Sequence, residues 1–146
     1  MKTPQSSPPL PPVLVDTPIW RNYFLRAERT FREINALMDA GRICCTDLIV
    51  GELLGSAETE EEIKVLRDLT QVFPLLREPP GAWVEAARLA FRLRERGKTL
   101  PLRDAYLAFM AQAHGVLLYT NNQKVRHAQR ALALTLNFFR PGRSSE

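Results

Sequence analysis

The sequence predicts an α/β fold with three layers, in which a central, mainly parallel sheet of about five short strands lies between two layers of helices. Two observations lead to this prediction. Short apolar segments alternate along the chain with longer stretches in which apolar residues recur at helical spacing. The short segments are also apolar without interruption, as is typical of strands that are buried on both faces of a parallel sheet.

Length and composition limit the chain to one domain of ordinary size, with 146 residues of which 45% are hydrophobic and 25% charged. We expect a proline-rich flexible tail over residues 1–12, the folded domain over residues 13–139 and a polar tail over residues 140–146. No apolar stretch approaches the ~20 residues that span a bilayer, so we expect no membrane association. Cys44 and Cys45 are the only cysteines, which excludes a disulfide framework and favours the reducing cytoplasm.

The first half of the chain is predicted to hold two strands and four helices. Strands are expected over residues 13–15 and 42–45, and helices over residues 19–25, 27–40, 48–55 and 58–70. The second helix carries Phe31, Ile34 and Met38 on one face and ends at Gly41, a residue suited to the left-handed position after a helix. Thr46 can cap the helix that follows the second strand.

The second half continues the same alternation. Strands are expected over residues 71–75, 116–119 and 134–138, and helices over residues 82–96, 102–113 and 121–131. A Pro-Pro-Gly turn precedes the first of these helices, and Gly97 and Gly115 end the first and second. No glycine-rich phosphate loop follows any strand, so nucleotide-binding folds of that kind are not indicated.

Polar residues that follow the predicted strands are the first candidates for a functional site. In an open α/β sheet, ligands bind beyond the carboxyl ends of the strands. Asp16 ends the first strand, and Thr120, Asn121 and Asn122 follow the strand over residues 116–119.

Two further acids, Glu52 and Asp104, lie in apolar stretches of helices that should pack on the sheet. A carboxylate in such surroundings is costly unless a cation, a helix N-terminus or a metal ion pairs with it. The plainer alternatives are salt bridges, with Arg103 beside Asp104, and a capping role for Asp16. Taken together, three carboxylates repel one another unless a divalent cation neutralises them. Oxygen ligands without a neighbouring His or Cys favour Mg²⁺ or Mn²⁺, which suit phosphodiester hydrolysis.

Three segments resemble the motifs of the PIN-domain ribonucleases, in order, spacing and secondary structure. Residues 13–20 (VLVDTPIW) look like the first motif, in which a strand ends in Asp followed by Ser or Thr. Residues 45–54 (CTDLIVGELL) and 100–108 (LPLRDAYLA) are similar to the second and third motifs. The series is most like the VapC-type toxins of bacterial toxin–antitoxin pairs, which implies a PIN-like fold.

The resemblance also implies a function. It indicates a metal-dependent endoribonuclease that hydrolyses RNA phosphodiester bonds, forms a homodimer and is inhibited by a cognate antitoxin protein, an arginine of which can enter the acidic pocket. The catalytic residues that it implies are Asp16, Glu52, Asp104 and Asn122, and the three acids among them would bind Mg²⁺ or Mn²⁺.

The fourth motif departs from the family pattern. Asn122 stands where the family usually has Asp, Lys124 where a second acid often follows, and Val125 where Phe is common. The amide keeps an oxygen acceptor but lowers the negative charge of the pocket by one. A second hypothesis is therefore a catalytically weakened or inactive PIN-domain protein that binds RNA or a partner protein. A third is an interaction module without a nucleic-acid role.

Four further residues are candidates for substrate binding. The hydroxyls of Thr17 and Thr120 could orient the site, and Lys124 and Arg126 belong to a basic segment beside the fourth motif. The alternatives are turn hydroxyls for the threonines and a solvated helix face for the basic residues. Lys and Arg outnumber Asp and Glu by 20 to 16, which permits nucleic-acid binding without requiring it.

Overall fold

The computed structural model describes residues 10–141, so residues 1–9 and 142–146 of the two predicted tails lie outside the described residues. The described part folds into seven helices and four strands, and none of these helices is long and apolar enough to cross a membrane. In chain order the elements are β1 (Val13–Val15), α1 (Thr17–Phe24), α2 (Glu28–Asp39), β2 (Ile43–Cys44), α3 (Asp47–Gly55), α4 (Glu60–Thr70), α5 (Ala82–Glu95), α6 (Leu102–His114), β3 (Leu117–Tyr119), α7 (Gln123–Ala131) and β4 (Asn137–Phe138).

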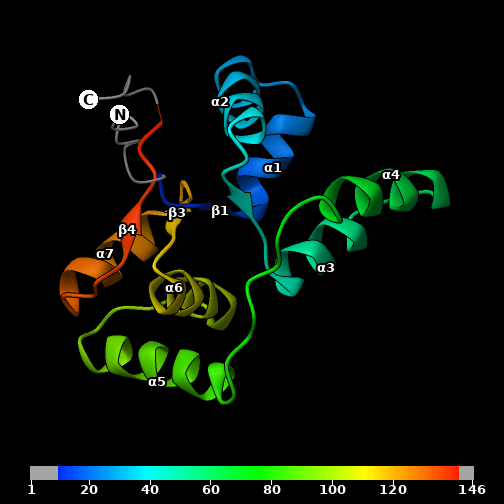
Figure 1. Cartoon of the computed structure of the whole chain (residues 1–146). Coiled ribbons are helices and arrows are strands. Elements are labelled where there is room, and N and C mark those ends of the chain that lie inside the picture. Colours follow the sequence, from blue (N-terminus) through cyan, green and yellow to red (C-terminus); the bar gives the residue numbers. More distant parts are fainter. Residues whose placement is uncertain (1–9, 142–146) are drawn as a thin grey trace, which may run out of the picture.

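The four strands form one parallel sheet in the order β2-β1-β3-β4. Val13 pairs with Ile43 on one side and with Leu117 on the other, so β1 is a central strand. Figure 1 shows α1 and α2 on one side of the sheet and α5 and α6 on the other, which gives three layers. The predicted α/β fold is confirmed, although the sheet lacks one of the predicted strands.

The missing strand is the one expected over residues 71–75. The backbone N–H groups of residues 72 and 73 donate to carbonyls three residues back, so the chain leaves α4 through turns. Pro74 follows and has no N–H with which to extend a sheet. Leu75 alone pairs, as an isolated parallel bridge with Cys45. The apolar residues of this short segment are compatible with a strand, but the chain forms turns here and only one residue pairs with the sheet.

Capping residues move two helix starts away from the predicted positions. Asp16 caps α1, which therefore begins at Thr17 instead of residue 19. Asn122 caps α7, which begins at Gln123 instead of residue 121. In both helices a short polar side chain accepts a hydrogen bond from a backbone N–H of the first turn, which fixes the start.

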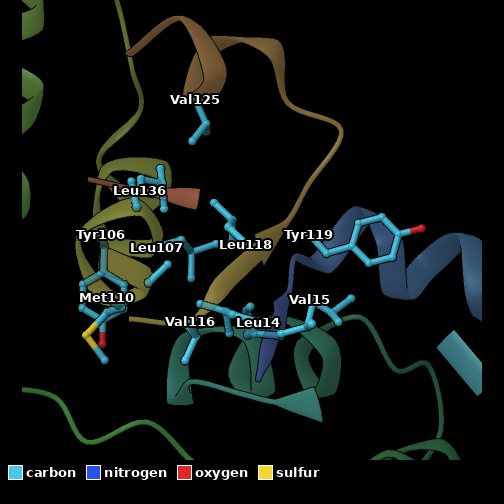
Figure 2. Packing of buried hydrophobic residues seen from close by; sticks show 14 of the residues in the cluster. Leu14, Val15, Tyr106, Leu107, Met110, Val116, Leu118, Tyr119, Val125 and Leu136 are labelled. Carbon is cyan, nitrogen blue, oxygen red and sulfur yellow. The ribbon is translucent and has the colours of Figure 1, made fainter. Parts of the chain in front are cut away.

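The core lies between the sheet and its helices. All three residues of β1 are fully buried, as the unbroken apolar segment predicted. Figure 2 shows Leu107 and Met110 of α6 gathered with Leu14 and Leu118 of the sheet. On the other side, Trp20 of α1 is 1% exposed. Because the strands are held from both faces, the residues that follow them are held in place too.

Candidate functional site

Asp16 lies directly beyond the carboxyl end of β1 and is only 2% exposed. Its Oδ1 accepts a hydrogen bond from the backbone N–H of Thr17 at 2.8 Å, which caps α1. Its Oδ2 accepts from the hydroxyl of Thr120 at 2.8 Å. Thr120 follows β3, the neighbour of β1 in the sheet, so the two residues meet at one edge. The carboxylate is thus held in one orientation from both sides.

Glu52 reaches the same place from the middle of α3. That helix begins after Thr46, whose hydroxyl oxygen accepts from the backbone N–H of Ile49 at 3.3 Å, as the sequence predicted. Thr17 donates its hydroxyl to Oε1 of Glu52 at 2.6 Å. Thr17, the first residue of α1, therefore positions the Glu52 carboxylate of α3.

Asp104 enters from the first turn of α6 and is 6% exposed. Its neighbour Arg103 joins the three acids. The guanidinium of Arg103 donates to Oδ1 of Asp104 at 2.6 Å and to Oδ1 of Asp16 at 3.1 Å. It also donates to both carboxylate oxygens of Glu52, at 2.5 and 3.0 Å. One fork-shaped cation thus contacts all three predicted acids, and the salt-bridge alternative holds for each of them.

The charges in this cluster do not balance. Three carboxylates face the guanidinium of Arg103, and Arg21 also lines the cavity without bonding to any of them, so the cluster keeps a net negative charge. Burial alone would raise the pKa of Glu52, but hydrogen bonds from Arg103 and Thr17 and the charges of Arg103 and Arg21 hold that pKa below its usual value. Burial would lower the pKa of Arg103, but its bonds to Glu52 and Asp104 and the charge of Asp16 raise it. Both partners therefore stay charged.

The cluster lies on a cavity of about 400 Å³, and the four residues predicted to be catalytic all line it. The lining residues are Asp16, Thr17, Pro18, Arg21, Glu52, Arg103, Asp104, Asn121 and Asn122. Residues far apart in the sequence thus meet at the carboxyl ends of parallel strands, where the fold places ligand sites.

The donor set is of the kind that Mg²⁺ and Mn²⁺ prefer, because it consists of carboxylate and hydroxyl oxygens. Within residues 10–141, however, no three His, Cys, Asp or Glu side chains are arranged so that they hold a metal ion as they stand. The three acids converge on Arg103 instead. The residues fit such an ion in chemistry, but a guanidinium takes the central position among them.

Asn122 lines the cavity, but its side-chain oxygen has another partner. This Oδ1 accepts from the backbone N–H of Lys124 at 2.9 Å and so caps α7. The backbone N–H of Asn122 in turn donates to the hydroxyl of Thr120 at 3.1 Å. The amide at this position therefore has a structural role that a carboxylate could also fill.

The two basic candidates lie outside the acidic cavity. Lys124 borders a second cavity of about 230 Å³, together with Lys98 and His127. Arg126 places its guanidinium 4.4 Å from the centre of the Phe138 ring and donates weakly to the carbonyl of Thr120 at 3.5 Å. Burial and the charges of two neighbouring arginines lower the pKa of Arg126.

Two residues of the site were missed by sequence reasoning. The sequence pairs Arg103 with Asp104 alone, and nothing in the spacing indicates that it also reaches Asp16 and Glu52. Arg21 lines the cavity as well. It lies four residues after Thr17 on α1, so helical periodicity could have placed it on the same face.

A parallel α/β domain with buried acids beyond its strands is what the PIN domain family is expected to show, and the family profile of the PIN domain matches residues 13–131. The chain therefore belongs to the PIN domain family. A search of curated protein sequences finds no match.

Among solved structures, the fold is similar to toxin–antitoxin complexes. VapBC-1 from nontypeable Haemophilus influenzae has a TM-score of 0.68 at 18% identity, covering 87% of this chain and 96% of that chain. VapBC2 from Rickettsia felis, bound to a DNA fragment from its promoter, has a TM-score of 0.67 at 16% identity, with the same coverages. VapBC-5 from Mycobacterium tuberculosis has a TM-score of 0.58 at 18% identity, covering 88% and 100%.

Proposed function

We propose that this PIN domain is an endoribonuclease of the VapC toxin type that hydrolyses RNA phosphodiester bonds with the help of Mg²⁺ or Mn²⁺. One observation carries the proposal: Asp16, Glu52 and Asp104 come from three separate elements and gather on one cavity beyond the strand ends. Membership of the PIN domain family and the fold of the VapBC structures support it.

In this proposal Asp16, Glu52 and Asp104 would hold the divalent ion. When bound, the ion supplies Lewis-acid stabilisation of the phosphate and a more acidic water. The chain itself keeps its ligands in place. Thr120 fixes the orientation of Asp16, and Thr17 fixes that of Glu52. Because these hydrogen bonds exist before a ligand arrives, little reorganisation is needed in the reaction.

Basic residues beside the acidic cavity would bind the RNA backbone. Lys98 follows α5, whereas Lys124 and His127 belong to α7, and the fold brings all three to one small cavity. Within residues 10–141, neither lysine forms an ion pair with a carboxylate, so both charges are available to phosphate oxygens. Arg126, on the same helix, lines a different cavity together with Thr120 and Asn121 and would offer a separate phosphate contact. Such contacts add affinity without reading the base sequence.

The partner in this proposal is an antitoxin, because the structures of similar fold are VapBC complexes. A groove of about 760 Å³ between the end of α1, the loop that joins α3 to α4, and α4 itself offers a surface for it. The groove exposes Phe24, Leu25 and Val65, and Arg21 lines both the groove and the acidic cavity. An antitoxin segment bound in the groove would therefore lie near Arg21, at the border of the acidic cavity. We further propose that the protein forms a homodimer and acts in the cytoplasm.

Cleavage of RNA by the purified, partner-free chain tests the function. We expect Mn²⁺-dependent cleavage of a structured RNA, lost in Asp16→Asn, which keeps the capping acceptor but removes the charge. Asp68→Asn, on the exposed face of α4, is the matched control and should cleave like wild type. Equal cleavage by wild type and Asp16→Asn would show that this site does not cut RNA.

A weakened or inactive enzyme is the second candidate function, favoured by the amide oxygen of Asn122 that caps α7. Asn122→Asp should then raise cleavage, because it restores a negative charge beside the cavity while keeping a capping oxygen. Strong cleavage by the unaltered protein would refute this candidate.

A further inference from the structure

We propose that Arg103 is a resident cation of the acidic cluster, which a divalent ion must displace before it can bind. The inference rests on the proposed function, since the competing ion is the one assigned to that site. It concerns the chain's own arginine, which the cavity holds in the position where the three carboxylates converge.

The contacts of Arg103 are those of a built-in ligand. Its guanidinium uses the Nε, Nη1 and Nη2 atoms, and every acid of the cluster receives at least one hydrogen bond. The side chain is 26% exposed, so most of it is withdrawn from water. An exposed arginine that merely approached an acid would satisfy one partner, whereas this one satisfies three.

The negative charge that remains in the cluster favours replacement of Arg103 by a divalent ion. One guanidinium neutralises a third of the charge of three carboxylates, whereas a divalent ion neutralises two thirds. Close negative charges repel most strongly where water is excluded, and Asp16 and Asp104 are both buried. The cluster therefore favours a stronger cation than the one it holds, but that cation must first break the bonds to Arg103.

The fold gives Arg103 room to leave. Its backbone is fixed in the first turn of α6, next to Asp104, while its long side chain borders a cavity of about 400 Å³. A displaced guanidinium would still face this cavity, within reach of whatever lies beside the acids. There it could donate two parallel hydrogen bonds to a phosphate group, the geometry that suits arginine best.

Mn²⁺ binding to the full-length protein, measured by electron paramagnetic resonance without RNA, tests the competition. Arg103→Gln removes the cation and should bind Mn²⁺ at least about tenfold more tightly than wild type. Arg92→Gln is the matched control, because Arg92 is exposed on α5, lies outside the acidic cavity and is not bonded to a carboxylate within residues 10–141. We expect its affinity to change by less than about threefold.

Folding is checked by circular dichroism, and Arg103→Lys provides a second variant that keeps the charge but loses the fork. It should bind Mn²⁺ more tightly than wild type and less tightly than Arg103→Gln. If both variants bind Mn²⁺ no better than wild type, the proposal is overturned and Arg103 merely positions the acids.

The two proposals can fail separately. Tight Mn²⁺ binding by Arg103→Gln together with a wild type that cleaves no RNA would uphold the competition and refute the nuclease. RNA cleavage by wild type with unchanged Mn²⁺ affinity in both Arg103 variants would do the reverse.

Discussion

The hydroxyl of Thr120 donates to Oδ2 of Asp16 at 2.8 Å, and both residues are almost inaccessible to solvent. They follow neighbouring strands of the sheet, although 104 positions separate them in the chain. The orientation of the most deeply buried acid of the site therefore depends on a hydroxyl from the other half of the sequence.

Replacing that hydroxyl should destabilise the protein. Thr120→Val keeps the side-chain shape but leaves a buried carboxylate oxygen without its donor, which costs about 1–3 kcal/mol. Urea unfolding measures the loss in free energy. Thr99→Val, at an exposed position, should stay within about 0.5 kcal/mol of wild type. A loss at Thr120 no larger than at Thr99 would mean that water replaces the missing hydroxyl.

The pairing of Glu52 should make stability depend on acid pH. Burial alone would raise the pKa of Glu52, but hydrogen bonds from Arg103 and Thr17 and nearby positive charge lower it in the folded protein. A lowered folded pKa gives stability that is present above the unfolded value of about 4.3 and is lost as the pH falls through the folded pKa.

The thermal midpoint should therefore fall more steeply below about pH 5 in wild type than in Glu52→Gln. Glu95→Gln, at an exposed position near the end of α5, should keep the wild-type slope. Parallel curves for wild type and Glu52→Gln would show that the pair does not favour the charged carboxylate.

The two thiols should be unreactive in the native protein. Burial, and then the neighbouring Cys45, raise the pKa of Cys44 to about 12. Burial raises the pKa of Cys45 to about 11. A hydrogen bond with the backbone of Thr46 opposes this rise, and the charge of Asp47 adds to it. At pH 8 both thiolate fractions are then roughly 10⁻³ or less. Ellman's reagent should label two thiols promptly in guanidinium and neither in the folded chain; prompt labelling without denaturant contradicts this.

The cavity bordered by Lys98, Lys124 and His127 should contribute to the salt dependence of RNA binding. Lys124→Gln removes one phosphate contact, so the slope of log affinity against log salt should fall by about 0.7 for single-stranded RNA. Fluorescence anisotropy with labelled RNA in EDTA measures it without cleavage. Lys64→Gln on α4 is the control and should leave the slope unchanged. If both variants show the same slope, Lys124 does not contact the phosphates of the bound RNA.

Sequence patterns located the acids but not the group between them. An unbroken apolar segment identified β1 as a buried strand, and the rule about strand ends then singled out Asp16. The reach of Arg103 depends on how the fold places the start of α6 near Asp16 and Glu52, and on one side-chain conformation. Neither leaves a mark in residue spacing. The same holds for Arg126, whose ring contact with Phe138 requires the position of β4.

The failed strand prediction has a different origin. Residues 71–75 are rich in apolar side chains, but Val72 and Leu75 are 70% and 53% exposed. Local composition does not reveal whether a neighbouring strand is available to pair with such a segment. Here the edge next to Cys45 accepts a single residue, so the segment crosses the surface as a turn and a bridge.

The central place of β1 has a consequence for biosynthesis. Val13 leaves the ribosome long before its partner Leu117 is made. Pairing across such a separation is slow, because the entropy of a long loop is lost before the contacts that stabilise it can form. Until translation has passed β3, the nascent strand has one open edge, so truncated products should be prone to association and proteolysis.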